Sequence, residues 1–205
     1  PNQSKNVVPF YTATYNEAEK VPVKKRDLDE VIQFVFVGTL STGKRPEYVI
    51  ELVNELLKKG VNCKLDFYGE GTQRLLLENL ISNYGLEDLV TLHGNVDAET
   101  VKAALKQAHF VVLPSKSEGW PKAIAEGMFW GAVPLATKVS CLEYMLDKGN
   151  RGILLNLNLK TDTQLIKNLV AQPEAFHQMA DAAAQWSRQF TLDRFENDIK
   201  QLLQG

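Results

Sequence analysis

A strand, a loop and a helix follow one another directly in His109-Phe-Val-Val-Leu-Pro-Ser-Lys-Ser-Glu-Gly-Trp-Pro-Lys-Ala-Ile-Ala-Glu126. The apolar run at its start is typical of a buried strand, and its last residues have helical spacing. Pro121 suits the first helical position, where a missing N–H costs nothing. Glu118 would then lie in the loop and Glu126 about two turns along the helix. Free N–H groups at the helix start favour an anionic ligand beside these carboxylates.

The same alternation of strand and helix continues along the chain. Apolar runs that predict strands occupy residues 31–37, 63–68, 89–93, 109–113, 132–136 and 152–155. Helical patterns lie between them at 48–57, 72–84, 98–107, 121–130 and 140–146, and residues 161–203 predict two or three more helices. Apolar strands that alternate with helices indicate a parallel sheet covered on both faces.

The fold class that follows is α/β. We expect a Rossmann-like, six-stranded parallel sheet with helices on both faces, followed by carboxyl-terminal helices, in a domain at residues 29–205. Residues 1–28 are polar and interrupted by proline, and we interpret them as a linker or arm with at most a short helical turn. In such sheets ligands bind beyond the carboxyl ends of the strands, where all the glycine-rich turns of this chain converge.

Composition excludes several classes of function. The 205 residues have a net charge of -2 and no basic footprint, so we expect no nucleic-acid partner. No apolar stretch reaches the length of a membrane span and no signal peptide is visible, so we expect a cytoplasmic protein. Cys63 and Cys141 lack metal-ligand spacing, and we expect free thiols and no metal. Since the chain starts with Pro1 and not with Met, we expect it to be part of a longer protein.

The first predicted turn resembles a phosphate-binding loop. Gly38-Thr-Leu-Ser-Thr-Gly-Lys44 matches the start of a P-loop between a strand and a helix. A P-loop needs Ser or Thr at the next position to hold magnesium, whereas this chain has Arg45 and then Pro46. We therefore reject an NTPase and expect Lys44 and Arg45 to face a diphosphate without metal. A solvated basic turn is the alternative.

Other turns leave two interpretations open. Gly69-Glu-Gly71 suits a tight turn that gives a ligand close access to the backbone. His93, which precedes Gly94, either contacts the ligand or forms a structural hydrogen bond. Trp120 either stacks on the ligand or fills the loop. Glu118 either meets a ligand or stabilises the start of the helix electrostatically.

At these residues the chain resembles the carboxyl-terminal, donor-binding domain of the group 1 (family 4) retaining glycosyltransferases, one half of a GT-B fold. The similarity spans about residues 31–203. It rests on Phe36-Val-Gly-Thr-Leu with Lys44, Phe67-Tyr-Gly-Glu-Gly, Val90-Thr-Leu-His-Gly94, Leu113-Pro-Ser with Glu118-Gly119, Glu126, and Gly131-Ala-Val-Pro.

The resemblance implies a role for each matching residue. Lys44 would bind the donor diphosphate, Glu126 the ribose hydroxyls, and Glu118 would lie at the transferred sugar, with Glu118 and Lys44 as the catalytic pair. The base would lie near His93 and Gly94. The full set of expected donor-binding residues is Gly38, Thr39, Lys44, Arg45, Gly69, His93, Gly94, Glu118, Gly119, Trp120, Pro121, Lys122 and Glu126.

Two positions depart from the family pattern. The family usually has an arginine directly after the first-strand glycine, and this chain has Thr39. Diphosphate binding would then depend on Lys44 with help from Arg45 or Lys122. Pro121 replaces a frequent glycine and removes an amide donor, so a phosphate contact would move to a neighbouring group.

The implied activity is transfer of a sugar from a nucleoside diphosphate sugar, with retention and without a metal or other cofactor. Such enzymes bind the acceptor on a separate amino-terminal domain that this chain lacks, so we expect weak donor binding and little transfer. The alternative is a non-catalytic nucleotide-binding or interaction module. The usual setting is polysaccharide biosynthesis. We expect an exposed apolar strip on the last helices, and a dimer through that strip is possible. The full-length enzyme could also associate peripherally with the inner face of a membrane.

Overall fold

The sheet has six parallel strands in the order β3-β2-β1-β4-β5-β6. The structure, a computed structural model, describes residues 11–204. The strands are β1 (Ile32–Val37), β2 (Cys63–Tyr68), β3 (Val90–Gly94), β4 (Phe110–Leu113), β5 (Val133–Thr137) and β6 (Ile153–Leu155). The strand order reverses between β1 and β4, which pair side by side. The expected fold class is confirmed.

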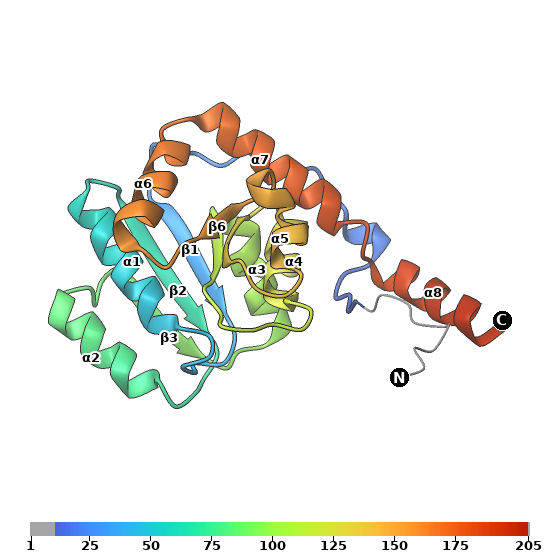
Figure 1. Cartoon of the computed structure of the whole chain (residues 1–205), viewed down its shortest axis with the longest axis horizontal. Helices are drawn as coiled ribbons and strands as arrows, with labels where there is room; N and C mark the ends of the chain where they lie inside the picture. Colours follow the sequence, from blue (N-terminus) through green and yellow to red (C-terminus); the bar gives the residue numbers. More distant parts are fainter. Residues whose placement is uncertain (1–10, 205) are drawn as a thin grey trace, which may run out of the picture.

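Helices cover both faces of this sheet (Figure 1). They are α1 (Pro46–Lys58), α2 (Arg74–Tyr84), α3 (Ala98–Gln107), α4 (Lys122–Phe129), α5 (Leu142–Met145), α6 (Leu159–Val170), α7 (Pro173–Ser187) and α8 (Leu192–Gln204), with 3-10 turns η1 (Glu17–Glu19) and η2 (Asp147–Gly149). Helix α1 contacts α2 and α6, whereas α3 contacts α4. Helix α8 projects away from the sheet.

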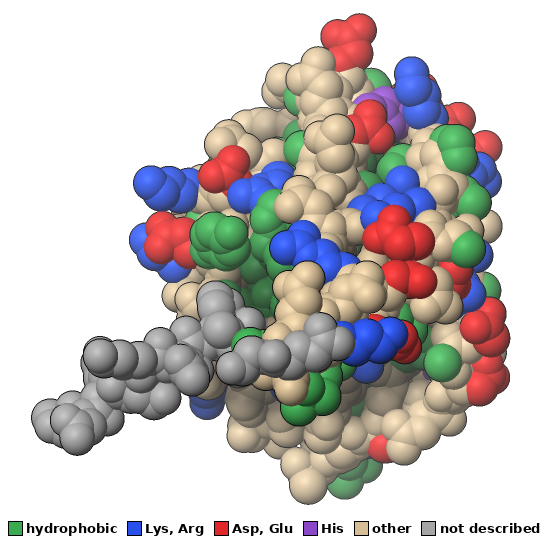
Figure 2. All heavy atoms as spheres, turned by 90° about the vertical axis from the view of Figure 1, so that its right-hand side faces the viewer, with side chains coloured by type: hydrophobic (Ala, Val, Ile, Leu, Met, Phe, Trp, Pro, Cys, Tyr) green, Lys and Arg blue, Asp and Glu red, His purple; other side chains and the backbone are tan. Residues whose placement is uncertain are grey.

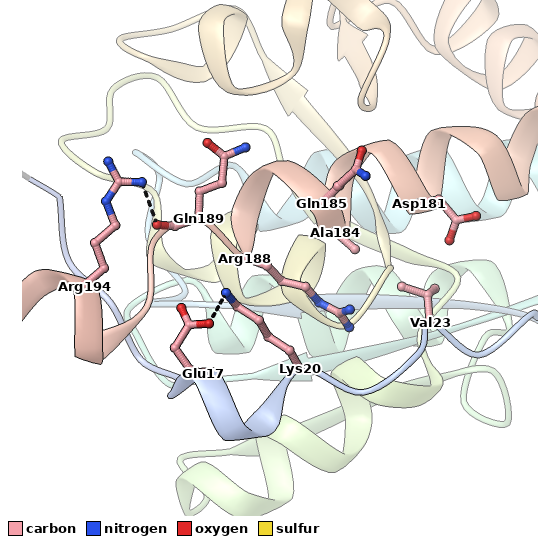
Figure 3. Close-up of a pocket in the computed structure, with 9 residues that line it drawn as sticks. All are labelled: Glu17, Lys20, Val23, Asp181, Ala184, Gln185, Arg188, Gln189 and Arg194. Atoms are coloured by element: carbon pink, nitrogen blue, oxygen red, sulfur yellow. Dashed lines mark hydrogen bonds and ion pairs between the residues drawn. The ribbon is translucent and has the colours of Figure 1, made fainter.

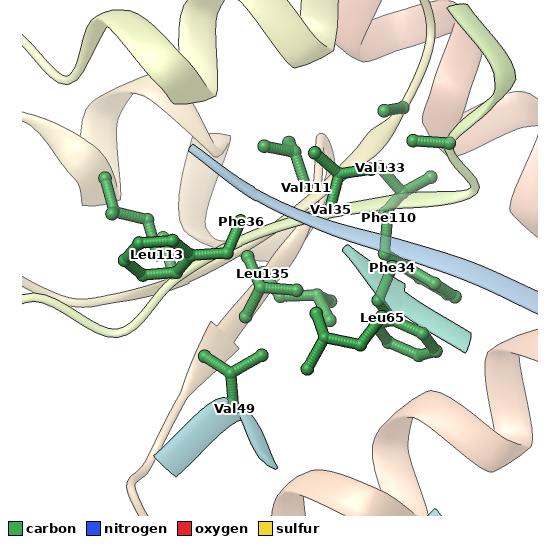
Figure 4. Close-up of a cluster of buried hydrophobic side chains, with 14 of the residues drawn as sticks. Phe34, Val35, Phe36, Val49, Leu65, Phe110, Val111, Leu113, Val133 and Leu135 are labelled. Atoms are coloured by element: carbon green, nitrogen blue, oxygen red, sulfur yellow. The ribbon is translucent and has the colours of Figure 1, made fainter. Parts of the chain in front are cut away.

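The core lies between the strands and these two helix layers. Phe34 and Phe36 of β1 and Phe110 of β4 are fully buried (Figure 4). Phe67 of β2 is fully buried as well. The rings of Phe34 and Phe110 stack with their centroids 5.0 Å apart. Because helices cover both faces of the sheet, β4 and β5 are buried along their whole length. Strand β1 includes Gln33, and β2 includes Lys64 and Asp66 between its buried residues.

The helix after β4 begins one residue later than its proline suggested. Pro121 is the N-cap residue, with φ -78° and ψ 80°, and helix α4 starts at Lys122. The carbonyl of Pro121 still accepts the first helical bonds, from the amides of Ile124 and Ala125. The expectation that Pro121 would be the first helical residue is therefore wrong by one position, a shift within the usual uncertainty of helix ends.

The expected arm at residues 1–28 packs closely against the domain from residue 11 on; its first ten residues lie outside the described part of the chain. Tyr15 is buried against Phe129 and Trp130, with ring centroids 4.9 and 5.1 Å away. Arg26 is also buried, and its guanidinium donates to the carbonyls of Trp130 and Gly131 at 2.9 and 2.6 Å. These carbonyls end helix α4, where the helix dipole favours a cation.

The last helices expose apolar side chains at separate places, among them Leu165 of α6, which is 41% exposed. Trp186 of α7 is 8% exposed and packs on Phe190, with ring centroids 4.7 Å apart, so the prediction of an exposed apolar strip is wrong there. At the end of α8, Leu202 and Leu203 are 54% and 81% exposed. Within the described residues, no helix has the length and apolar character needed to cross a membrane.

Candidate functional site

Two glycine turns meet at the carboxyl edge of the sheet. Gly69 follows β2 with φ +140°, and a Cβ atom there would lie 2.0 Å from the carbonyl oxygen of Gly38, which follows β1. A Cβ on Gly71 would lie 2.3 Å from the carbonyl oxygen of Leu40. Only glycine allows so close an approach of two backbones. The tight turn expected at 69–71 is therefore present. Its two glycines are needed because the backbone of the turn after β1 lies directly against them.

A cavity of about 290 Å³ lies beside these turns, beyond the ends of β1, β2 and β3. Three expected donor-binding residues line it, namely Gly38, Thr39 and Gly69. Tyr68 and Asn95 also contribute to the wall. Sequence reasoning missed both, although Tyr68 directly precedes Gly69 and Asn95 directly follows Gly94. The cavity lies at the carboxyl edge of the sheet, where ligands of such folds bind.

His93 lies on the surface of the sheet and makes a structural interaction. Its Nε2 atom lies 2.7 Å from Oδ1 of Asp66, and its ring stacks on Tyr68 with the centroids 4.5 Å apart. The carbonyl of Gly94 accepts a hydrogen bond from the amide of Gly69 at 2.8 Å. Of the two interpretations, the structural hydrogen bond is present; His93 borders the cavity only through Tyr68.

Lys44 and Glu118 meet in an ion pair, with Nζ 2.5 Å from Oε1. The Glu118 side chain is 7% exposed and that of Lys44 is 29% exposed. Lys44 precedes α1, whereas Glu118 lies in the loop after β4, and the neighbouring positions of β1 and β4 in the sheet bring both loops together. The structure thus places an isolated cation-carboxylate pair where a diphosphate and a sugar were expected.

Backbone contacts fix the two loops that carry this pair. The amide of Lys116 donates to the carbonyl of Gly43 at 2.8 Å. The guanidinium of Arg45 donates to the carbonyl of Pro114 at 3.1 Å. Arg45 has a left-handed backbone, with φ +50°. It was expected to face the ligand, but in this structure it holds the two loops together.

The loop after β5 supports Glu118 from the other side. The Ser140 hydroxyl donates to the carbonyl of Glu118, and the Cys141 thiol donates to the carbonyl of Gly119 at 3.4 Å. Burial raises the pKa of the Cys141 thiol, which keeps it protonated as a donor. Sequence reasoning missed these two residues, since only the order of the strands brings them beside Glu118.

Glu126 lies in helix α4 and contacts the amino-terminal segment. Its Oε1 atom accepts a hydrogen bond from the Thr14 hydroxyl at 2.7 Å and lies 3.7 Å from Nζ of Lys122. The Glu126 side chain is 14% exposed. Within residues 11–204 no hydrogen bond or ion pair joins it to Lys44 or Glu118. The structure therefore brings Lys44 and Glu118 together and leaves Glu126 in a separate contact.

Residues 17–186 match the family model described as "Glycosyl transferases group 1". The chain belongs to this family. It is 30% identical over 170 residues to the alpha-D-kanosaminyltransferase of Streptomyces kanamyceticus, a match that covers 82% of this chain and 44% of the relative. It is 26% identical over 165 residues to the D-inositol 3-phosphate glycosyltransferase of an Arthrobacter species, which covers 78% of this chain and 39% of that protein. The chain thus spans less than half the length of these relatives.

Solved structures agree on the fold of this group 1 glycosyltransferase chain. The carboxyl-terminal domain of the group 1 protein LpcC from Francisella tularensis has a TM-score of 0.73 at 16% identity, covering 87% of this chain and 100% of that domain. Anabaena HepE, in complex with UDP and glucose, has a TM-score of 0.76 at 17% identity, covering 86% of this chain and 49% of its own. The resemblance to the carboxyl-terminal half of a GT-B fold is confirmed.

Trp120 of this glycosyltransferase fills its loop. Its ring stacks on that of Trp186 at 6.2 Å between centroids and meets the edge of Phe190 at 5.2 Å. Its Nε1 atom is buried and has no hydrogen-bond partner among the residues that the structure describes. The amide of Lys122 donates to the carbonyl of Trp120 at 2.9 Å and closes the turn before α4. Trp120 therefore packs on the aromatic rings at the end of α7, and its contact with a ligand stays a prediction.

A larger cavity, of about 670 Å³, lies between residues 17–23 and the junction of α7 with α8 (Figure 3). None of the expected site residues lines it. Several of its charged side chains have partners: Lys20 pairs with Glu17 at 2.5 Å, and Arg194 donates to the carbonyl of Gln189 at 3.1 Å. Figure 2 shows basic and acidic side chains interspersed over the upper and middle parts of one face of the molecule.

The described residues contain no group of three or more His, Cys, Asp or Glu side chains arranged to hold a metal ion. The carboxylates at the carboxyl edge each have a cation or hydroxyl partner of their own, as Glu118 has Lys44. Chemistry at this edge can therefore draw on Lys44, the buried carboxylate of Glu118 and the backbone of the adjacent loops, with Glu126 in its separate contact.

Proposed function

We propose that this chain binds the nucleoside diphosphate sugar of a retaining glycosyltransferase at the carboxyl edge of its sheet. The observation that carries the proposal is the contact of Lys44 with Glu118 at 2.5 Å, at the point where the strand order reverses. Ligands of open α/β sheets bind at such points. Membership of the group 1 family supports the same chemistry.

Each group has a part in the proposed complex. The diphosphate takes Lys44, and Glu118 accepts hydroxyl groups of the sugar. Glu126 accepts the ribose diol, and the cavity lined by Gly38, Thr39 and Tyr68 receives the base. The reported complex of Anabaena HepE with UDP and glucose, a chain of the same fold, supports a donor of this class.

The chemistry proposed for this half is electrostatic. When the bond between sugar and diphosphate breaks, negative charge grows on the leaving group. Lys44 and the backbone amides near Gly119 stabilise that charge with groups fixed before the reaction. Because this requires neither metal nor other cofactor, we propose that the donor binds without either. Thr39 in place of an arginine leaves Lys44 as the principal cation.

Transfer needs an acceptor as well. The chain spans 44% and 39% of two relatives, and we propose that the acceptor binds to a part of the enzyme outside these 205 residues. The chain alone should then bind donor and transfer little.

Calorimetric titration with UDP, GDP and ADP, each with and without EDTA, tests this function. We expect one of the three to bind, equally well in EDTA, and its sugar derivative to bind more tightly because Glu118 adds contacts. Failure of all three to bind at millimolar concentration would refute the proposal. Binding that requires magnesium would contradict it in favour of an NTPase.

A non-catalytic nucleotide-binding module is the second candidate. Thr39, at the position where the family usually has arginine, favours it, because weaker diphosphate binding is tolerable in a domain that performs no chemistry. Two results together would support this candidate instead. The chain would bind a nucleoside diphosphate and its sugar derivative with equal affinity, and the full-length protein would transfer no sugar.

A further inference from the structure

Thr14 contacts a proposed ligand-binding carboxylate from outside the part of the chain that matches the family. Its hydroxyl donates to Oε1 of Glu126 at 2.7 Å, across 112 positions of sequence. The family match begins only at residue 17. The contact is therefore a feature of this chain's own amino-terminal segment.

The backbone around Thr14 is held firmly enough to fix that hydroxyl. The next residue, Tyr15, is 7% exposed and packs on Phe129, in the same helix as Glu126. The carbonyl of Tyr15 accepts the amide of Leu192 at 3.0 Å. On the same helix, the carbonyl of Ala125 accepts the Ser187 hydroxyl at 2.6 Å. Residues 14–15 and the end of α7 thus hold the part of α4 that carries Glu126.

The two oxygens of Glu126 differ in their contacts. Oε1 has Thr14 and Lys122 as partners, whereas Oε2 has none within residues 11–204. The last torsion of a glutamate is broad and has no sharp preferred angle, so an unrestrained carboxylate turns freely. A hydroxyl donor on Oε1 fixes the plane of the carboxylate and therefore the direction of Oε2.

We propose that Thr14 is a positioning residue that orients Glu126 toward the vicinal hydroxyl groups of the nucleotide ribose. The inference rests on the proposed function, since it requires the nucleotide to bind beside Glu126. The inference adds that Thr14, in the segment before residue 17, raises the affinity of the chain for a ribose diol.

Two substitutions separate the hydroxyl from the shape of the side chain. Thr14→Val keeps the volume and removes the donor, and Thr14→Ser keeps the donor and removes a methyl group. Thr12→Val is the matched control, because the Thr12 hydroxyl is buried in the same segment without a hydrogen-bond partner. Thermal melting of each variant verifies that it is folded.

The ligands are the nucleoside diphosphate among UDP, GDP and ADP that binds, and its 2′,3′-dideoxy analogue. We expect Thr14→Val to bind the ribonucleotide about tenfold more weakly, as for loss of one hydrogen bond to a charged group. Its affinity for the dideoxy analogue should be unchanged. Thr14→Ser should restore the wild-type affinity and Thr12→Val should retain it.

Other outcomes overturn the inference. If wild-type protein prefers the ribonucleotide and Thr14→Val keeps that preference, Thr14 has no positioning role while the proposed function stands. An equal loss for both ligands would assign Thr14 a structural role only. If wild-type protein binds none of the three nucleotides, the proposed function fails and this inference fails with it.

Discussion

Replacing Glu118 by glutamine should strengthen the binding of a bare nucleoside diphosphate. The wild-type carboxylate holds Nζ of Lys44 at 2.5 Å, and a diphosphate must break or share that contact to use the lysine. The amide of Glu118→Gln has nearly the same shape but no charge. Lys44 would then be free to bind the diphosphate.

The exposure of the pair sets the magnitude. Lys44 is 29% exposed and Glu118 is 7% exposed, so solvent screens the pair only in part. Exposed ion pairs contribute about 0.2–1 kcal/mol, and this partly buried pair belongs near the upper end. A gain of about 1 kcal/mol corresponds to about fivefold tighter binding. Loss of the negative charge beside the diphosphate acts in the same direction.

Calorimetry on wild-type protein and two variants measures this effect. Glu143→Gln is the control, because it removes the same charge from helix α5, where Glu143 pairs with Lys138 at 2.5 Å. We expect about fivefold tighter binding of the diphosphate by Glu118→Gln and less than about twofold change by Glu143→Gln. The sugar derivative should lose its advantage over the bare diphosphate. Weaker binding of the bare diphosphate by Glu118→Gln would refute the reasoning.

Three further predictions concern single residues. Glu126→Ala should weaken binding of a nucleoside diphosphate by about 1.5–3 kcal/mol, as for a lost charged hydrogen bond; unchanged calorimetric affinity would make Glu126 structural. Arg26→Met should lower the free energy of unfolding in urea by about 3 kcal/mol, because two carbonyls lose a buried charged donor; a loss under about 1 kcal/mol would contradict this account. Gly69→Ala should destabilise the fold by about 3 kcal/mol or more in the same assay, from the 2.0 Å approach to Gly38 and the positive φ. Gly85→Ala is the control, since Gly85 has φ +65° and open space around it, and this change should lower the free energy of unfolding by only about 1 kcal/mol. Equal losses for the two variants would show that the close approach to Gly38 is not the cause.

The fold was predictable because its signals are local. Each strand is a short apolar run and each helix has its own spacing, so β1 and β4 could be located without knowing their partners. Parallel connection then requires that the turns after all strands meet at one edge. This reasoning placed Lys44 and Glu118 at the same edge, where the structure joins them.

Contacts of the amino-terminal segment were not predictable in the same way. Residues 11–28 are polar and have no periodic pattern, yet they supply Thr14, Tyr15 and Arg26 to the surface of α4. Their partners lie more than 100 positions away in the sequence. A local pattern carries no information about contacts at that separation.

Side-chain directions also depended on the assembled structure. Trp120 and His93 each had two interpretations, and both side chains point to neighbours that come from other elements, Trp186 and Asp66. Arg45 was expected at the ligand and instead binds the carbonyl of Pro114. In each case the choice between rotamers depends on which partner the packing supplies.

By itself the sequence determined the α/β class, the parallel sheet and the edge that carries the candidate site, because hydrophobic period and turn chemistry are properties of consecutive residues. Only the tertiary structure decided which groups pair at that edge, that Glu126 faces Thr14, and that residues 11–28 pack against helix α4. Hydrogen bonds and packing form between surfaces whose distance depends on the whole chain, and no short segment encodes that distance.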